Sequence, residues 1–344
     1  MIHKIAVLKS SKLNEYRLPF VWQELNTAAT ELKPNFVFES GYGLLLGVSD
    51  ESLSRLGFDI LPRERLLQNA QFFLILKPTL ADLRLVRDGA TVLGWIHAMQ
   101  SPEVIDVAIK KSLTLIALEN CFDQLGYHIL RKNNHLAGRY GVEHALENFS
   151  SLTNKKACVI GYGDVGKGAV SALIEKGFAT TVFTRHSDQE KQVVFETYER
   201  YGGTLYVQKK PIAELFSEYG VIVNAIKQNM LQPVGFLSKN NEKVFQENTL
   251  IIDVSCDPGY GFPFAKVTHF ECPVEKIEHV YYYGIDNIPS FKYQKSSQVI
   301  SKALSNYLMP LLDVVKENTG LFQSAIETLQ GIILNKEIIA FQGR

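Results

Sequence analysis

Three glycines follow a short apolar run and precede a helical pattern, within the stretch GYGDVGKGA. Gly161, Gly163 and Gly166 have the spacing G-x-G-x-x-G, and Asp164 and Val165 lie inside it where the helix would begin. In a turn from strand to helix, such glycines permit a tight bend, close approach of the backbone to a pyrophosphate, and packing of the helix on the strand. The helix N-terminus adds free N–H donors for an anion. The pattern predicts dinucleotide binding; the plainer alternative is a tight turn without a ligand.

The end of the next expected strand bears on which dinucleotide would bind. An NAD site normally carries an acidic residue about 20 positions beyond the glycines, to accept a hydrogen bond from the ribose. Here the strand ends with Thr184 and Arg185 and has no carboxylate. A guanidinium pairs bidentately with a phosphate, so NADP(H) is favoured over NAD(H). Alternatively, Arg185 is solvated, or it stacks on the adenine of an NAD site.

Four further residues of chemically useful type stand at or just after the ends of expected strands: Arg17, Lys77, His97 and Asp257. Open α/β sheets bind ligands at the carboxyl ends of their strands. Fixed cations clamp a carboxylate, and a histidine can transfer a proton near neutral pH. Each residue alone also has a plainer interpretation, as a solvated strand end, a half-buried imidazole, a surface ion pair or a helix cap.

The elements that would position these residues are short apolar runs alternating with helical patterns, in two series. This alternation predicts an α/β fold of two Rossmann-like domains with parallel sheets. We expect residues 133–290 to form a dinucleotide-binding domain inserted into a discontinuous substrate domain, residues 1–132 plus 291–344. The substrate would then bind in the cleft between the two domains.

Composition excludes several other classes of protein. The 344 residues contain 36 Lys plus Arg and 36 Asp plus Glu, so no basic field favours nucleic acid or a membrane surface. The four cysteines are scattered without metal-ligand spacing, which indicates free thiols and no metal site. No secretory segment or membrane-spanning stretch is apparent, so we expect a cytoplasmic protein.

Several blocks of sequence, taken in order, resemble the alanine dehydrogenase/saccharopine dehydrogenase superfamily over nearly the whole chain. They are NEYRLP, FESGYG, LKP, GWIHAMQS, LAGRYG, the glycine turn, LIIDVSCDPG and GIDNIPS. The likeness is greatest to the N5-(carboxyethyl)ornithine synthase branch. Relative to alanine dehydrogenase itself, SCDPGYG replaces a DQGG-type segment and DNIPS replaces NMPG. The tyrosines at 281–283 could line a pocket for a second, larger substrate or pack in the core.

The resemblance implies roles for residues on the expected substrate domain. The arginine and lysine that match Arg17 and Lys77 hold the carboxylate and carbonyl of a 2-oxo acid. The histidine that matches His97 transfers a proton beside the reacting carbon. Lys77 is an alternative group for that transfer, and the sequence does not decide which residue is the acid and which the base.

The resemblance also implies roles on the expected dinucleotide-binding domain. The aspartate matching Asp257 lies beside the nicotinamide and the substrate, and the asparagine matching Asn287 orients both. Asn134 stands where the family has a small polar residue near the cofactor phosphates. A homo-oligomer is expected from the family alone.

The combined expectation is an enzyme acting on CH–NH groups. It would use NADPH to condense a 2-oxo acid such as pyruvate with the side-chain amine of a diamino acid such as ornithine or lysine. The first alternative is an alanine dehydrogenase or a saccharopine dehydrogenase-like enzyme. The second is a nucleotide-sensing module without turnover.

Overall fold

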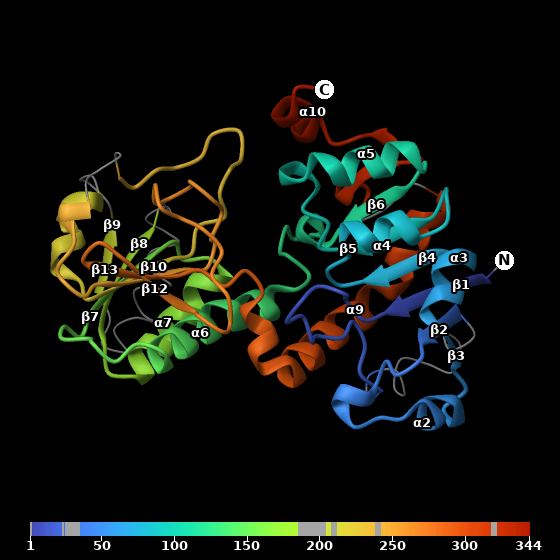
Figure 1. Cartoon of the computed structure of the whole chain (residues 1–344), viewed down its shortest axis with the longest axis horizontal. Coiled ribbons are helices and arrows are strands. Elements are labelled where there is room, and N and C mark those ends of the chain that lie inside the picture. The colour runs from blue at the N-terminus through green and yellow to red at the C-terminus, as the bar shows by residue number, and fades with distance from the viewer. Residues whose placement is uncertain are drawn as a thin grey trace. The chain divides into compact units, whose positions relative to one another are not determined.

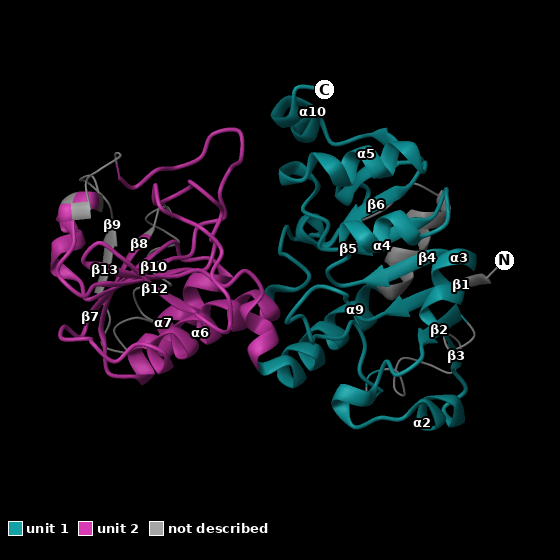
Figure 2. Ribbon diagram, viewed as in Figure 1, with its two compact units in different colours: residues 1–131, 292–344 teal, residues 132–291 magenta. Residues whose placement is uncertain are grey.

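The chain forms two compact units, which the computed structural model describes over residues 2–22, 24, 35–184, 204–207, 212–237, 242–317 and 322–344. Unit 1 comprises residues 1–131 and 292–344, and unit 2 comprises residues 132–291 (Figure 2). Each boundary lies one residue from the position expected. Most of the helix expected over 19–32, and all of Arg185, lie outside the described residues.

Unit 1 is built on an eight-stranded sheet with strand order β15-β14-β6-β5-β4-β1-β2-β3 (Figure 1). Strands β1 to β6 are parallel, and the last two run antiparallel as an edge hairpin next to β6. The strands are β1 (Ile2–Leu8), β2 (Phe36–Glu39), β3 (Asp59–Leu61), β4 (Ala70–Ile75), β5 (Thr91–Gly94), β6 (Thr114–Ala117), β14 (Ile326–Leu329) and β15 (Ile332–Ile333). The order reverses between β1 and β4, where doubly wound sheets bind ligands.

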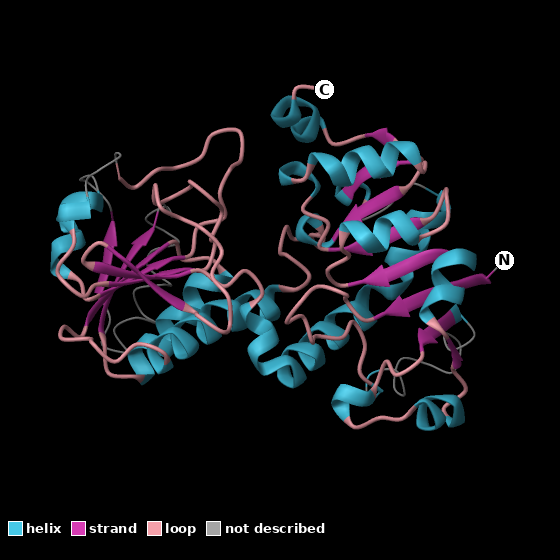
Figure 3. Cartoon of the chain, in the orientation of Figure 1, coloured by secondary structure: helices cyan, strands magenta, loops and turns pink. Residues whose placement is uncertain are grey.

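Helices cover both faces of this sheet, which explains why its strands are apolar without alternation. One core cluster includes Val7 and packs against α9, through Ile300 and Leu304. The other cluster includes Leu8 and joins residues of α3, α4 and α5. The described helices of unit 1 are α2 (Asp50–Arg55), α3 (Arg63–Asn69), α4 (Leu80–Leu85), α5 (Pro102–Lys110), α9 (Tyr293–Glu317) and α10 (Lys336–Gln342). Figure 3 draws the helices in cyan and the strands in magenta.

Unit 2 contains a seven-stranded sheet with the order β12-β13-β11-β10-β7-β8-β9, parallel except for β12. Its strands are β7 (Lys156–Ile160), β8 (Ala179–Thr184), β9 (Thr204–Val207), β10 (Val221–Asn224), β11 (Leu250–Asp253), β12 (Val274–Ile277) and β13 (Val280–Tyr283). The order reverses between β7 and β10, as it does between β1 and β4 in unit 1. The expected α/β fold with two parallel-sheet domains is therefore confirmed. No helix among the described residues is long and apolar enough to cross a membrane.

Two helices of unit 2, α6 (Arg131–Glu147) and α7 (Asp164–Glu175), cross with their backbones in contact. A Cβ atom added at Gly138 would lie 1.8 Å from the Val165 carbonyl oxygen, and one added at Gly168 would lie 1.9 Å from that of His135. Both glycines are therefore required by helix packing. The crossing holds Gly138 beside Val165 and His135 beside Gly168.

Gly138→Ala is expected to lower the free energy of unfolding by roughly 3 kcal/mol, because the added methyl group meets backbone rather than a movable side chain. Chemical denaturation followed by circular dichroism measures the change. Gly163→Ala is the matched control, since no described heavy atom lies within 4 Å of its added Cβ. Equal stability of the two variants would contradict the packing argument.

Candidate active site

The glycine turn joins β7 to α7. The fold of the chain itself requires glycine at two of the three positions of the turn. Gly161 has φ +96°, and a Cβ there would lie 3.0 Å from the Ala225 carbonyl oxygen. A Cβ at Gly166 would lie 2.1 Å from the Gly161 carbonyl oxygen. Glycine is thus required by the chain itself at both positions. At Gly163, no described heavy atom lies within 4 Å of the added Cβ, so the fold leaves open space there.

The N-terminus of α7 adds the second feature of an anion site. Gly163 is the N-cap, and no side chain caps the helix there. The first-turn N–H groups and the helix dipole therefore point from Asp164 and Val165 toward the open side of the turn. This arrangement fits a pyrophosphate, as the spacing predicts. Asn134 is half-buried in the first turn of α6. Thr184 ends β8.

A buried carboxylate beneath the loop after β11 is a residue that sequence reasoning missed. Asp253 is fully buried, and it accepts hydrogen bonds from Asn224 Nδ2 at 2.9 Å, the Cys256 N–H at 2.8 Å and the Tyr282 hydroxyl at 3.1 Å. Burial raises its pKa to about 6, although these donors act in the opposite direction. Cys256 has φ +40°, a conformation that the bond to Asp253 helps to hold. Asp253 thereby fixes the turn that leads into Asp257.

The remaining residues predicted on unit 2 lie in short turns. Asp257 is partly buried, and its carbonyl oxygen accepts the Tyr260 N–H at 3.0 Å. Asn287 is buried in the turn after β13, and its carbonyl oxygen accepts the Ser290 N–H at 2.8 Å. Tyr282 and Tyr283 are fully buried core residues, which rules out the pocket-lining alternative for these two.

On unit 1, Arg17 is buried in the loop after β1 and held on two sides. Glu15 forms a bidentate ion pair with its guanidinium, with Nε to Oε1 at 2.7 Å. The guanidinium carbon also lies 4.8 Å from the centre of the Trp95 ring, in a cation–π contact. Trp95 follows β5, so the contact links the β1 loop to the end of β5. The orientation of this cation is therefore set before any ligand binds.

Lys77 lies just beyond β4 and is also buried, with 8% exposure. Pro78 follows it and restricts its backbone to extended conformations. Ser10, in the loop after β1, donates a hydrogen bond from its hydroxyl to the Lys77 carbonyl oxygen at 2.6 Å. Arg17 and Lys77 thus come from the two strands that flank the reversal of strand order.

His97 follows β5, and about half of its side chain is exposed. Its backbone is left-handed, with φ +49°, which is uncommon outside glycine. The Glu119 carboxylate, after β6, accepts the N–H groups of His97 at 2.7 Å and Ile96 at 3.2 Å. Glu119 Oε1 also lies 4.0 Å from His97 Nδ1. Glu119 therefore holds His97 in place; its position at a strand end is the signal that could have identified it.

Burial raises the pKa of Glu119 to about 7, and repulsion from Glu327 acts in the same direction. The N–H groups of His97 and Ile96 favour the charged form but do not offset burial. Glu327 comes from β14 and accepts hydrogen bonds from Asn120 Nδ2 at 2.7 Å and Asn335 Nδ2 at 2.8 Å. Glu119, a carboxyl group with a pKa of about 7, thus lies next to His97.

The structure gathers the predicted residues into two sets, one on each unit. Arg17, Lys77 and His97 follow β1, β4 and β5 at the carboxyl edge of the unit 1 sheet. The glycine turn and Asp257 follow β7 and β11 at the carboxyl edge of the unit 2 sheet. Both sets lie where doubly wound sheets bind ligands. Among the described residues, no cluster of His, Cys, Asp and Glu side chains could hold a metal ion.

Comparison with known proteins gives matches along the whole chain. The family models for the N-terminal and C-terminal domains of alanine dehydrogenase/PNT match residues 6–136 and 138–339. An N(5)-(carboxyethyl)ornithine synthase from Clostridium botulinum is 26% identical over 338 residues, covering 91% of this chain and 98% of that protein. An alanine dehydrogenase from Halomonas elongata is 22% identical, covering 90% and 88%. A solved L-alanine dehydrogenase structure superposes with a TM-score of 0.81 at 17% identity, covering 99% of both chains, and shows the fold.

Glu119 is expected to make stability depend on pH between about 4.5 and 7. Its pKa is higher in the folded than in the unfolded protein, so the folded state binds the proton more tightly and loses stability as the pH rises through this range. In Glu119→Gln, the decrease in the free energy of unfolding over this pH range should be smaller by about 3 kcal/mol. Urea unfolding of both proteins at pH 5 and pH 8 measures it.

The decisive quantity is the change in the free energy of unfolding from pH 5 to pH 8. This change is compared between the wild type and the variant. Glutamine replaces one of the two acceptor oxygens, so the variant is expected to be less stable at pH 5. Asp253 contributes a pH dependence of the same sign to both proteins, and this contribution cancels. An unchanged pH dependence in Glu119→Gln would contradict the raised pKa.

Proposed function

The chain belongs to the alanine dehydrogenase/PNT family and is an NAD(P)-dependent oxidoreductase; we propose that it condenses a 2-oxo acid with the side-chain amine of a diamino acid. The 2-oxo acid would be pyruvate or similar, and the amine donor ornithine or lysine. The observation that carries this proposal is the 26% identity to an N(5)-(carboxyethyl)ornithine synthase across 98% of that protein. The product would be a secondary amine that bears two carboxylates.

The reaction needs a 2-oxo acid held in one orientation, and unit 1 has the groups for this. Arg17, aligned by Glu15 and Trp95, would clamp the carboxylate. Lys77 would donate a hydrogen bond to the carbonyl oxygen and stabilise the negative charge that develops there. Burial strengthens both interactions, because competing water is excluded.

Proton transfer is the second requirement. The amine adds to C2 of the 2-oxo acid to give a carbinolamine, which then loses its hydroxyl group as water to form an imine. His97 would move these protons, in a position held by Glu119. Bound NAD(P)H supplies the hydride that reduces the imine carbon. The balance is 2-oxo acid, amine, NAD(P)H and a proton in, and secondary amine, NAD(P)⁺ and water out.

Unit 2 would hold the nucleotide. The pyrophosphate would lie on the open side of Gly163, against the N-terminus of α7, with Asn134 nearby. Asp257 and Asn287 would face the nicotinamide and the substrate. We propose NADPH over NADH because the sequence continues from Thr184, the last residue of β8, with Arg185 rather than a carboxylate.

The test is oxidation of the reduced nicotinamide in the presence of pyruvate, with ammonia, ornithine or lysine as the amine. We expect turnover with a diamino acid and NADPH, less with NADH, and a fall of roughly 100-fold or more in His97→Gln. Turnover with ammonia alone would instead identify an alanine dehydrogenase. Nucleotide binding without turnover by any 2-oxo acid and amine would favour the sensing module.

Gly163→Ala tests the nucleotide site separately from turnover. The methyl group fits the folded chain but occupies the space proposed for the pyrophosphate. We expect the Kd for NADPH, measured by calorimetry, to rise roughly tenfold or more, with an unchanged melting temperature. Unaltered binding by this variant would mean that the pyrophosphate does not lie on the turn.

A further inference from the structure

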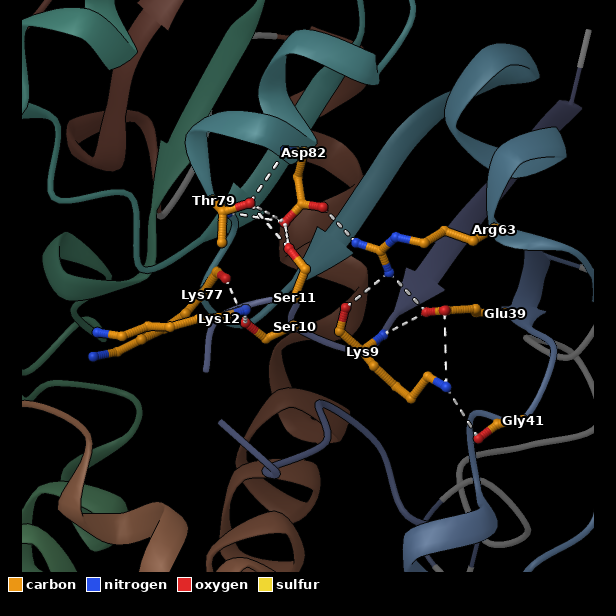
Figure 4. A network of polar contacts seen from close by, with 10 residues as sticks. All are labelled: Lys9, Ser10, Ser11, Lys12, Glu39, Gly41, Arg63, Lys77, Thr79 and Asp82. Carbon is orange, nitrogen blue, oxygen red and sulfur yellow. Dashed lines mark hydrogen bonds and ion pairs between the residues drawn. The ribbon is translucent and has the colours of Figure 1, made fainter. Parts of the chain in front are cut away.

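The backbone around Lys77 is held by a polar network that joins the ends of three strands (Figure 4). Ser10 makes two of its bonds. Its hydroxyl donates to the Lys77 carbonyl oxygen at 2.6 Å and accepts the N–H of Lys12 at 3.1 Å. One side chain therefore joins the loop after β1 to a residue just beyond β4. In the view of Figure 4, the side chains of Lys77 and Lys12 extend to the same side, away from the other residues drawn.

Asp82 holds the turn that follows Lys77. It is buried in α4, and its Oδ2 atom accepts the Thr79 N–H at 2.9 Å and the Ser11 hydroxyl at 2.6 Å. Thr79 in turn accepts the Asp82 N–H, which completes a capping box at the start of α4. The turn between Lys77 and α4 is thus fixed to the same loop that Ser10 contacts.

Arg63, from α3, completes the network. Its guanidinium donates to Asp82 Oδ1 at 2.5 Å, to Glu39 Oε2 at 2.9 Å and to the Lys9 carbonyl oxygen at 3.1 Å. Glu39 ends β2 and is buried, as is Asp82. Two buried carboxylates need a cation nearby. The planar guanidinium of Arg63 bonds both of them and also bonds the loop after β1.

We propose that Ser10 and Asp82 are positioning residues for Lys77, with Arg63 as the charge that holds Asp82. They fix the carbonyl group of Lys77 and the turn that follows it, so that its amine meets the 2-oxo acid at a set position. This inference rests on the proposed role of Lys77. None of the three residues is assigned to contact the substrate.

Ser10→Ala is the primary test, because it removes one hydroxyl without leaving a buried charge unpaired. We expect KM for the 2-oxo acid to rise roughly five- to tenfold, the effect of losing one hydrogen bond, while KM for NADPH does not change. Ser10→Thr keeps the hydroxyl and should restore KM. Arg63→Lys should act in the same direction, because an ammonium cannot bond Asp82 and Glu39 as a fork.

Ser49→Ala is the matched control. Ser49 caps α2 in the same unit by accepting the Ser52 N–H at 3.2 Å, so its loss has a comparable structural cost without contact to the network. We expect Ser49→Ala to lower the melting temperature about as much as Ser10→Ala and to leave KM unchanged. Equal effects of the two variants on KM would overturn the proposal.

A readout independent of turnover separates this inference from the proposed function. Competitive acetylation with acetic anhydride, read by peptide mass spectrometry, reports the reactivity of Lys77 relative to other lysines. We expect the relative reactivity of Lys77 to change roughly threefold or more in Ser10→Ala and to stay the same in Ser49→Ala. Unchanged reactivity in Ser10→Ala would overturn the positioning role. Absence of turnover in wild type, with altered Lys77 reactivity in Ser10→Ala, would refute the proposed function alone.

Discussion

A charge buried at the end of a strand needs a partner, because an ion removed from water without one costs several kcal/mol. The carboxyl edge of the unit 1 sheet places Arg17, Lys77, Glu39 and Asp82 out of water. Arg17 and the two carboxylates are paired there through neighbouring loops and helices. Because Arg63 of α3 pairs with both Glu39 of β2 and Asp82 of α4, the requirement for charge pairing also makes this part of the sheet edge rigid.

The same strand order would serve two kinds of anion recognition in one chain under the proposed function. Unit 2 follows its first strand with glycines and a helix N-terminus, so a ligand would meet backbone N–H groups. Unit 1 follows β1 with a longer loop that brings Arg17 beside Trp95, so a ligand would meet side-chain cations. Backbone donors suit a pyrophosphate shared by many nucleotides, whereas a guanidinium suits a planar carboxylate. The loop after the first strand therefore determines the chemistry of each sheet.

Most of the fold follows from local pattern, since apolar runs, glycines and helical periodicity lie within short stretches of sequence. The glycine turn and the strand-end positions of Lys77 and His97 were predictable for this reason. The partners of these residues were not. Glu119 follows His97 by 22 positions, and only the adjacency of β5 and β6 brings its carboxylate under that residue. In the sequence, Asp253 is likewise an ordinary strand end. Only the folded chain brings Asn224 and Tyr282 into hydrogen bonds with it.

The insertion of unit 2 into unit 1 has a consequence for the order of folding during synthesis. Unit 2 is one continuous segment, so all of its strands are available before the last part of the chain is made. Unit 1 completes its sheet only when β14 pairs with β6, after both α9 and the whole of unit 2 have been synthesised. Glu327 arrives with β14 and contributes to the raised pKa of Glu119. The part of the raised pKa of Glu119 that comes from Glu327 therefore depends on a segment that is synthesised last.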